Sequence, residues 1–229
     1  ALWVPFRTGQ RVTGYIAYNS IGREIKWTDQ IVRRLRLIGE IFGAALERRR
    51  QGVELENRLR FESLLAELSR QFGILDADEL ELEIERWLEP IARTIDVEHV
   101  AVGTFSTPNC PESVTVMTWN AGASVRPLRP EEVPWLVQTL FEDGQSVAVD
   151  SLEDLPRQAA TDRHTFESVG IGAFISVPLR SGQGVYGGMS FCSLSKDRAW
   201  TEDLRSWLEL VAEVFANALA RHHAEREIE

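Results

Sequence analysis

The sequence predicts an α+β fold in which helices flank an antiparallel sheet. A hairpin-like segment occurs twice, as VPFRTGQRVTGYIAY at residues 4–18 and as VPLRSGQGVYGGMSF at residues 177–191. Between and after these copies the patterns read helix, hairpin, helix, strand, hairpin, helix. That order contains too few crossover connections for a parallel sheet.

The repeat extends well beyond the hairpin. Shifting the chain by 173 residues aligns Val4–Arg48 with Val177–Arg221 without a gap, and Trp27-Thr28-Asp29 falls on Trp200-Thr201-Glu202. A gapless repeat of this length predicts two copies of one domain. Residues 1–50 are then the C-terminal half of a first domain, with its last hairpin and helix, and residues 61–223 are a complete second domain.

The second copy begins with a helix and a hairpin. Asp76 and Glu79 form a potential capping box, and apolar residues at a 3.6-residue period predict a helix through Ile91, which Pro90 should kink or end early. Alternating apolar residues predict strands over 97–105 and 114–120. Residues 106–113 hold the turn between them.

Further elements follow in order. A short helix is predicted over 131–143 with Gly144 as its stop, then a short strand over 146–150 and a polar loop with a helical turn over 155–168. The repeated hairpin occupies 171–179 and 185–194. Thr201 caps a final helix that runs to about Ile228.

Two helical segments carry apolar residues that alternate in steps of four and three, as in a coiled-coil seam. They are Ile31, Leu35, Ile38, Phe42 and Ala45 in the first copy, and Leu204, Leu208, Val211, Phe215 and Ala218 in the second. A seam needs a partner, so we expect a homodimer. Residues 29–72 read as one long or twice-broken helix. Residues 51–73 are expected to connect the two domains, and residues 224–229 to begin a linker to an output module. The alternative is two amphipathic helices that pack only on their own domains.

Composition and charge exclude several classes of function. The net charge of −10 argues against a nucleic-acid surface, although residues 1–60 hold 12 of the 25 basic residues and only 6 of the 35 acidic ones. That basic block reads as a solvated helix face or as a surface for an acidic partner. Apolar runs are too short to cross a bilayer, and no basic-then-apolar leader opens the sequence. We therefore expect a cytoplasmic location and no membrane span.

The sequence resembles the GAF domain, a small α+β sensory module found in tandem upstream of histidine kinases. The resemblance lies in Ser176-Val-Pro-Leu-Arg180, Gly182, Gly187, Arg198-Ala-Trp-Thr201 and the helix Leu210–Leu219, with residues 61–69 and 155–163 similar to modules that precede bacterial sensor kinases. It implies a cup between the sheet and residues 130–169, in which some members hold cyclic nucleotides, bilins, haem or a metal.

The residues present favour none of these cofactors, and no metal site is predicted. The Asn-Lys-Phe-Asp-Glu signature of cyclic-nucleotide binders is absent, and no histidine adjoins Cys110 or Cys192, as a bilin thioether site would need. His164 could be an axial haem ligand but reads as a surface residue. A small organic ligand remains open, with these candidate pocket residues: Phe105, Trp119, Trp135, Phe141, Arg157, Asp162, Arg163, His164, Phe174 and Met189.

The functional prediction is a non-catalytic sensory fragment of a bacterial signal-transduction protein, a sensor histidine kinase of a two-component system. A ligand or partner at the cup would change the packing of the terminal helix, with Leu35, Ile38, Phe42, Leu204, Leu208, Val211 and Phe215 as the dimer and signalling positions. Two readings compete with it. One is a GAF-fold thiol-dependent reductase that uses Cys192 or Cys110. The other is a dimerisation scaffold that binds no ligand.

Overall fold

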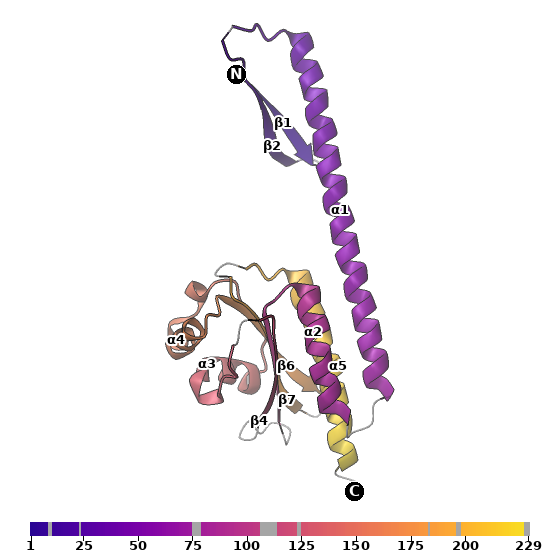
Figure 1. The fold of residues 1–229 in the computed structure, drawn as a ribbon, viewed down its shortest axis with the longest axis vertical. Helices are drawn as coiled ribbons and strands as arrows, with labels where there is room; N and C mark the ends of the chain where they lie inside the picture. Colours follow the sequence, from indigo (N-terminus) through magenta and orange to yellow (C-terminus); the bar gives the residue numbers. More distant parts are fainter. Residues whose placement is uncertain are drawn as a thin grey trace. The chain divides into compact units, whose positions relative to one another are not determined.

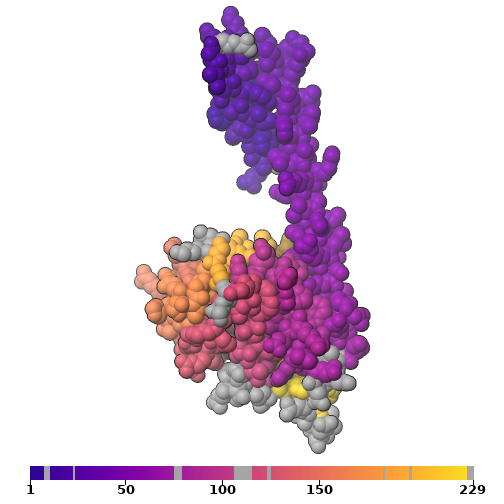
Figure 2. Space-filling view, in the orientation of Figure 1, coloured from indigo at the N-terminus to yellow at the C-terminus, as the bar shows by residue number. Residues whose placement is uncertain are grey.

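The structure is a computed structural model that describes residues 1–8, 11–22, 24–74, 79–105, 114–122, 125–182, 184–195 and 198–226. It divides into two compact units, residues 1–60 and residues 61–229. Figure 2 shows the surface of both in sequence colours. The predicted turn at 106–113, Cys110, Asp76 and the last residues of the final helix lie outside the described residues.

The second unit is built on a five-stranded antiparallel sheet, which confirms the predicted fold class (Figure 1). The strands are β3 (His99–Phe105), β4 (Val114–Asn120), β5 (Val147–Val149), β6 (Ala173–Ser181) and β7 (Gly184–Ser193). Their order across the sheet is β4-β3-β7-β6-β5. The central strand β7 is paired with β3 on one side and with β6 on the other, so the repeated hairpin forms the middle of the domain.

Helices cover both faces of this sheet (Figure 1). Helices α2 (Leu80–Ile95) and α5 (Glu202–Arg226) lie on one face, together with the last residues of α1 (Asp29–Ile74) that belong to this unit. The other face carries η2 (Pro130–Glu132), α3 (Pro134–Val137), η3 (Gln138–Glu142), η4 (Leu152–Asp154), η5 (Arg157–Ala159) and α4 (Ala160–Ser168). We call residues 130–142 and 152–169, which lie before and after β5 in the chain, the lid. Each face has its own buried apolar cluster.

Helix α2 continues past Pro90 to Ile95, whereas the sequence predicts a kink or an early end at that proline. Pro90 is exposed, and so is Arg86, the residue whose carbonyl loses its hydrogen-bond partner. Ile91 and Ile95 are buried beyond it. Burial of one apolar stripe on both sides of the proline outweighs the lost hydrogen bond. The helix ends at Asp96, whose φ of 57° is left-handed.

The lid is more helical than the sequence predicts. Residues 160–168 form a helix in place of a polar loop with a helical turn, and the helix predicted over 131–143 is split into three short segments. The buried face of α4 consists of Asp162, Thr165 and Phe166. Two of these three side chains are polar, so the apolar period that predicts helices elsewhere is missing here.

The first unit contains a hairpin, β1 (Leu2–Thr8) and β2 (Arg11–Tyr18), and the first half of α1. Its register repeats that of β6 and β7. Val4 pairs with Ile16 as Val177 pairs with Met189, and a bulge follows Phe6 as one follows Leu179. The 173-residue repeat is therefore a repeat of strand pairing as well as of sequence.

The predicted seam of α5 is covered inside its own unit. Leu208, Val211 and Phe215 are fully buried in the cluster that includes α2 and the sheet, and Leu204 packs against that cluster. These side chains are not free for a second chain, which corrects the expectation that they form a dimer seam. In the first unit, by contrast, Leu35 is partly exposed and Ile38 and Phe42 are exposed.

Candidate functional site

A cavity of about 130 Å³ lies between the sheet and the lid. Its floor comes from β3, β6 and β7, with Val116 of β4, and its roof comes from lid residues such as Leu136, Leu140 and Phe166. This is the position that the family resemblance implies for the cup.

Small side chains on the floor create the space. Adjacent strands bring Ala101 beside Ser190 and Gly103 beside Gly188, and Ser190 in turn lies beside Ser176. Because side chains alternate along a strand, the larger neighbours of these residues point to the opposite face. A Cβ atom on Gly188 would lie 3.1 Å from the ring of Phe141, so glycine at this position lets the roof approach the sheet.

His99 is a titratable group on the floor. It is 4% exposed, and its Nδ1 lies 2.8 Å from Oδ1 of Asn120. The same Asn120 oxygen accepts a hydrogen bond from the backbone N–H of Val125 at 3.2 Å. That oxygen is therefore an acceptor, and His99 must donate to it from Nδ1.

The protonation of His99 follows from its surroundings. Burial lowers its pKa below the ordinary value of 6.5, and the hydrogen bonds to Asn120 and to the backbone of Trp119 offset only part of that effect. At neutral pH the ring is uncharged with its proton on Nδ1, so Nε2 is a hydrogen-bond acceptor. Sequence reasoning missed this residue. The available signal was a histidine on the small-residue face of a strand, with Asn120 at the end of its partner strand.

Two hydroxyl groups form a second polar feature of the floor. Ser176 Oγ and Ser190 Oγ lie 2.7 Å apart on adjacent strands, and both residues line the cavity. One hydroxyl hydrogen is used between them, which leaves the other available to a ligand. Cys192 also lines the cavity, and burial raises its pKa to about 12, so the thiol stays protonated at neutral pH.

The lid is held together by side-chain to backbone hydrogen bonds. The buried carboxylate of Asp162 accepts from the N–H groups of Trp135 at 3.3 Å and Leu136 at 2.8 Å. The Thr165 hydroxyl donates to the carbonyl of Glu132 at 2.8 Å. These three bonds join α4 to α3 and to the end of η2, so the two halves of the roof form one layer.

The structure brings together only some of the predicted pocket residues. Phe141 and Phe174 line the cavity. Phe105 is buried and packs edge to face with Phe141, with ring centroids 4.7 Å apart. Trp119 and Met189 pack with the cluster on the other face of the sheet, because they occupy the opposite phase of their strands.

The remaining candidates belong to the lid. Trp135 packs within the lid cluster, and Asp162 serves as described above. Arg163 donates to the carbonyls of Glu153 and Leu155. Arg157 and His164 are exposed and do not line the cavity. Within the described part of the chain there is no cluster of three or more metal-ligating side chains.

The start of α5 is tied to the edge strand that leads into the lid. Trp200 Nε1 donates to the carbonyl of Val149 at 3.1 Å, and its backbone N–H donates to the Asp150 carboxylate at 3.0 Å. Strand β6 lies between the cavity and α5. Its Ser176 lines the cavity, and its fully buried Val177 belongs to the cluster that contains α5. The cavity and α5 are therefore separated by one layer of sheet.

None of the described helices is both long enough and apolar enough for a membrane span.

Comparison with known proteins agrees with this geometry. The sequence profile of a family described as "GAF domain" matches residues 79–219. No curated protein matches the chain.

Solved structures share the fold at low sequence identity. A phycoerythrobilin-bound GAF domain from a cyanobacterial phytochrome is 14% identical, with a TM-score of 0.59, over 74% of this chain and 99% of that one. The GAF domain of a phosphoenolpyruvate-protein phosphotransferase from Coxiella burnetii is 12% identical, with a TM-score of 0.57, over 74% and 98%. GAF3 from Slr1393 of Synechocystis sp. PCC6803, in its photoproduct state, is 17% identical, with a TM-score of 0.52, over 66% and 99%.

Proposed function

Because this chain belongs to the GAF domain family, we propose that residues 61–223 form a sensory module that binds a small molecule in the cavity beneath the lid. The observation that carries the proposal is the cavity itself, which has a small-residue floor and a few convergent polar groups. Such pockets are the usual form of small-molecule sites.

The ligand we propose is compact and largely apolar, with at least one hydrogen-bond donor. A volume of about 130 Å³ is close to the roughly 150 Å³ of an engineered cavity that binds benzene. Nε2 of neutral His99 offers an acceptor, and the Ser176 and Ser190 pair offers a donor. Bilins, which some solved GAF structures contain, are larger than this space, so we propose a smaller ligand.

The signal would leave the cavity through β6 and β5. A ligand that moves the lid would act on β5 and Asp150. Trp200 is hydrogen-bonded to both, and Arg205 in the first turn of α5 lies 3.8 Å from the Asp150 carboxylate. A ligand that displaces the Ser176 side of β6 would act on the α5 side of the same strand. Helix α5 would then pass the change to an output module.

We further propose a tandem arrangement, with residues 1–50 as the last hairpin and helix of a preceding GAF domain. The common register of the two hairpins supports it. The proposed parent protein is a dimeric cytoplasmic sensor histidine kinase, as the family resemblance suggests. A catalytic role is not part of the proposal, because burial of Cys192 and its raised pKa disfavour the thiolate that a reductase needs.

Hydrogen–deuterium exchange with phenol as the probe tests the proposal. Phenol should bind and slow exchange in the lid, and it should also change exchange in the first turns of α5. The variant Ala101→Leu, which fills the floor of the cavity, should remove both effects. Binding that persists in Ala101→Leu, or binding without any change at α5, would contradict the proposed mechanism.

A further inference from the structure

The first unit repeats the contact between hairpin and helix that is found in the complete domain. Small residues occur at the same two positions in both copies. Gly39 and Gly43 in α1 correspond to the buried Ala212 and Ala216 in α5. A Cβ atom on Gly39 would lie 3.4 Å from Val4, so α1 crosses β1 closely.

The two helices differ in what covers their other apolar side chains. Phe42 is 55% exposed and Ile38 is 39% exposed, whereas their counterparts Phe215 and Val211 are both 0% exposed. The ring of Phe215 is covered by Phe72, with ring centroids 4.8 Å apart. The first unit thus presents the same face without the elements that bury it in the second.

Two arginines show the same difference. In the complete domain Arg180 donates to the carbonyl of Gly144, and Arg221 donates to the carbonyls of Phe72 and Gly73 at the end of α1. These interactions cap exposed carbonyls with a cation, as is favourable at a helix C-terminus.

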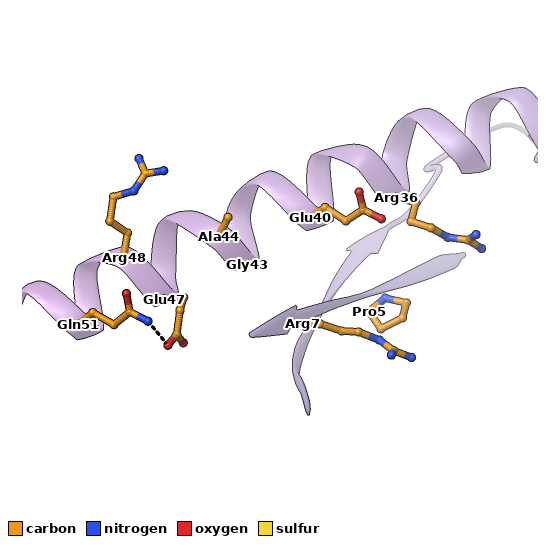
Figure 3. Close-up of a pocket in the computed structure, with 9 residues that line it drawn as sticks. All are labelled: Pro5, Arg7, Arg36, Glu40, Gly43, Ala44, Glu47, Arg48 and Gln51. Atoms are coloured by element: carbon orange, nitrogen blue, oxygen red, sulfur yellow. Dashed lines mark hydrogen bonds between the residues drawn. The ribbon is translucent and has the colours of Figure 1, made fainter. Parts of the chain in front are cut away.

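The counterparts of these arginines are Arg7 and Arg48, which border a groove of about 860 Å³ between the hairpin and α1. Neither makes a hydrogen bond or an ion pair with the residues that the structure describes. In Figure 3 their side chains extend in different directions, Arg7 from the strand and Arg48 from the helix. The guanidinium groups are placed for partners on two separate elements, as in the complete domain.

We propose that Ile38, Phe42, Arg7 and Arg48 form a docking surface for the first half of the preceding GAF domain, supplied upstream in the same polypeptide. The docked segment corresponds to residues 61–173. A helix of this segment ends beside Arg48, so that its last carbonyls accept hydrogen bonds from the guanidinium group. An apolar side chain of the same segment covers Phe42. One contact is not repeated, because Trp207, which donates to the carbonyl of Phe61, has Arg34 as its counterpart. The inference rests on the tandem arrangement proposed above.

Cysteine labelling tests this surface, in a Cys110→Ser background so that the introduced thiol is the one followed. Phe42→Cys and Ile38→Cys report on the surface. Leu37→Cys is the matched control, because Leu37 is 58% exposed and its counterpart Leu210 remains 47% exposed in the complete domain. A maleimide reagent is applied to the protein of residues 1–229 and to the full-length polypeptide of the same gene.

All three thiols should react rapidly in residues 1–229. In the full-length polypeptide, Phe42→Cys and Ile38→Cys should react at about one tenth of that rate or less, while the rate for Leu37→Cys should be unchanged. Equal rates in both proteins would overturn the proposal. Protection in residues 1–229 that grows with protein concentration would also overturn it, since a second copy would then cover the surface. The labelling needs no ligand, so its failure is separate from a failure of phenol to bind in the second unit.

Discussion

His99 and Asn120 are joined across strands β3 and β4 by a hydrogen bond of 2.8 Å that sets the tautomer of the histidine. Because Asn120 Oδ1 also accepts from Val125, the proton of neutral His99 is on Nδ1 and the acceptor is Nε2. His99, which in the sequence is one histidine of a predicted strand, thus gives the cavity a hydrogen-bond acceptor.

This polarity predicts a preference among aromatic probes. Phenol, which carries a donor, should bind more tightly than toluene, which does not. One net hydrogen bond is worth about 0.5–1.5 kcal/mol, or roughly a twofold to twelvefold difference in Kd. His99→Phe should abolish the preference, and His164→Phe, at an exposed histidine, should retain it. Titration calorimetry measures both; a preference that survives His99→Phe would show that another group reads the donor.

Stability should depend on pH through His99. Its pKa in the folded protein is below 6.5 because of burial, so the unfolded chain takes up the proton first as the pH falls. The contribution of neutral His99 is fully present above pH 6.5 and is lost as the pH falls through the folded pKa. The free energy of unfolding should therefore decrease more steeply below pH 6.5 in the native sequence than in His99→Phe. Parallel curves for the two proteins in urea unfolding would refute this assignment.

Asp162→Asn should loosen the lid. The carboxylate accepts two backbone N–H bonds at the start of α3, and an amide can match neither its charge nor both bonds. The expected loss in the free energy of unfolding is about 1–3 kcal/mol, with faster hydrogen exchange at Leu136. Asp154→Asn, at an exposed aspartate of the same lid, is the control and should change neither quantity. Unaltered exchange at Leu136 in Asp162→Asn would rule out this role.

Gly187→Ala should destabilise the sheet. Gly187 has a φ of 148°, and a Cβ atom there would lie 1.9 Å from the carbonyl oxygen of Gly103, which is backbone and cannot move aside. We expect a loss of about 3 kcal/mol or more. At the counterpart Gly14 the atoms nearest to an added Cβ belong to the ring of Phe6, and at Gly182 nothing lies within 4 Å, so Gly14→Ala and Gly182→Ala should both cost less. Thermal unfolding of the three variants gives the ranking, and equal Tm values would contradict the packing described.

The sequence predicts the sheet well because its strands obey simple alternation. Residues 114–120 form a strand as expected, and the hairpin at 173–193 follows its repeat. The sequence does not predict the helix α4 of the lid, because its buried face contains Asp162 and Thr165. Their burial depends on hydrogen bonds to Trp135 and Glu132, which no local sequence pattern reveals.

The cavity lies between the sheet and the lid, as the family resemblance implies, but only some of the predicted pocket residues line it. Aromatic side chains were natural candidates, yet Trp119 and Met189 lie on the other face, and the space comes from Ala101, Gly103 and Gly188. A cavity is made by missing side chains, and these become visible only when strand register brings small residues together. The α5 seam shows the same limit, because steps of four and three also describe a helix that packs on its own sheet.

Native mass spectrometry of the protein purified without denaturation shows whether the cavity holds a small ligand. We expect a mass above that of the polypeptide by one small molecule, which is released on denaturation and is absent from Ala101→Leu. An adduct that Ala101→Leu retains, or a protein of bare polypeptide mass that also fails to bind phenol, would show that the cavity is not a ligand site.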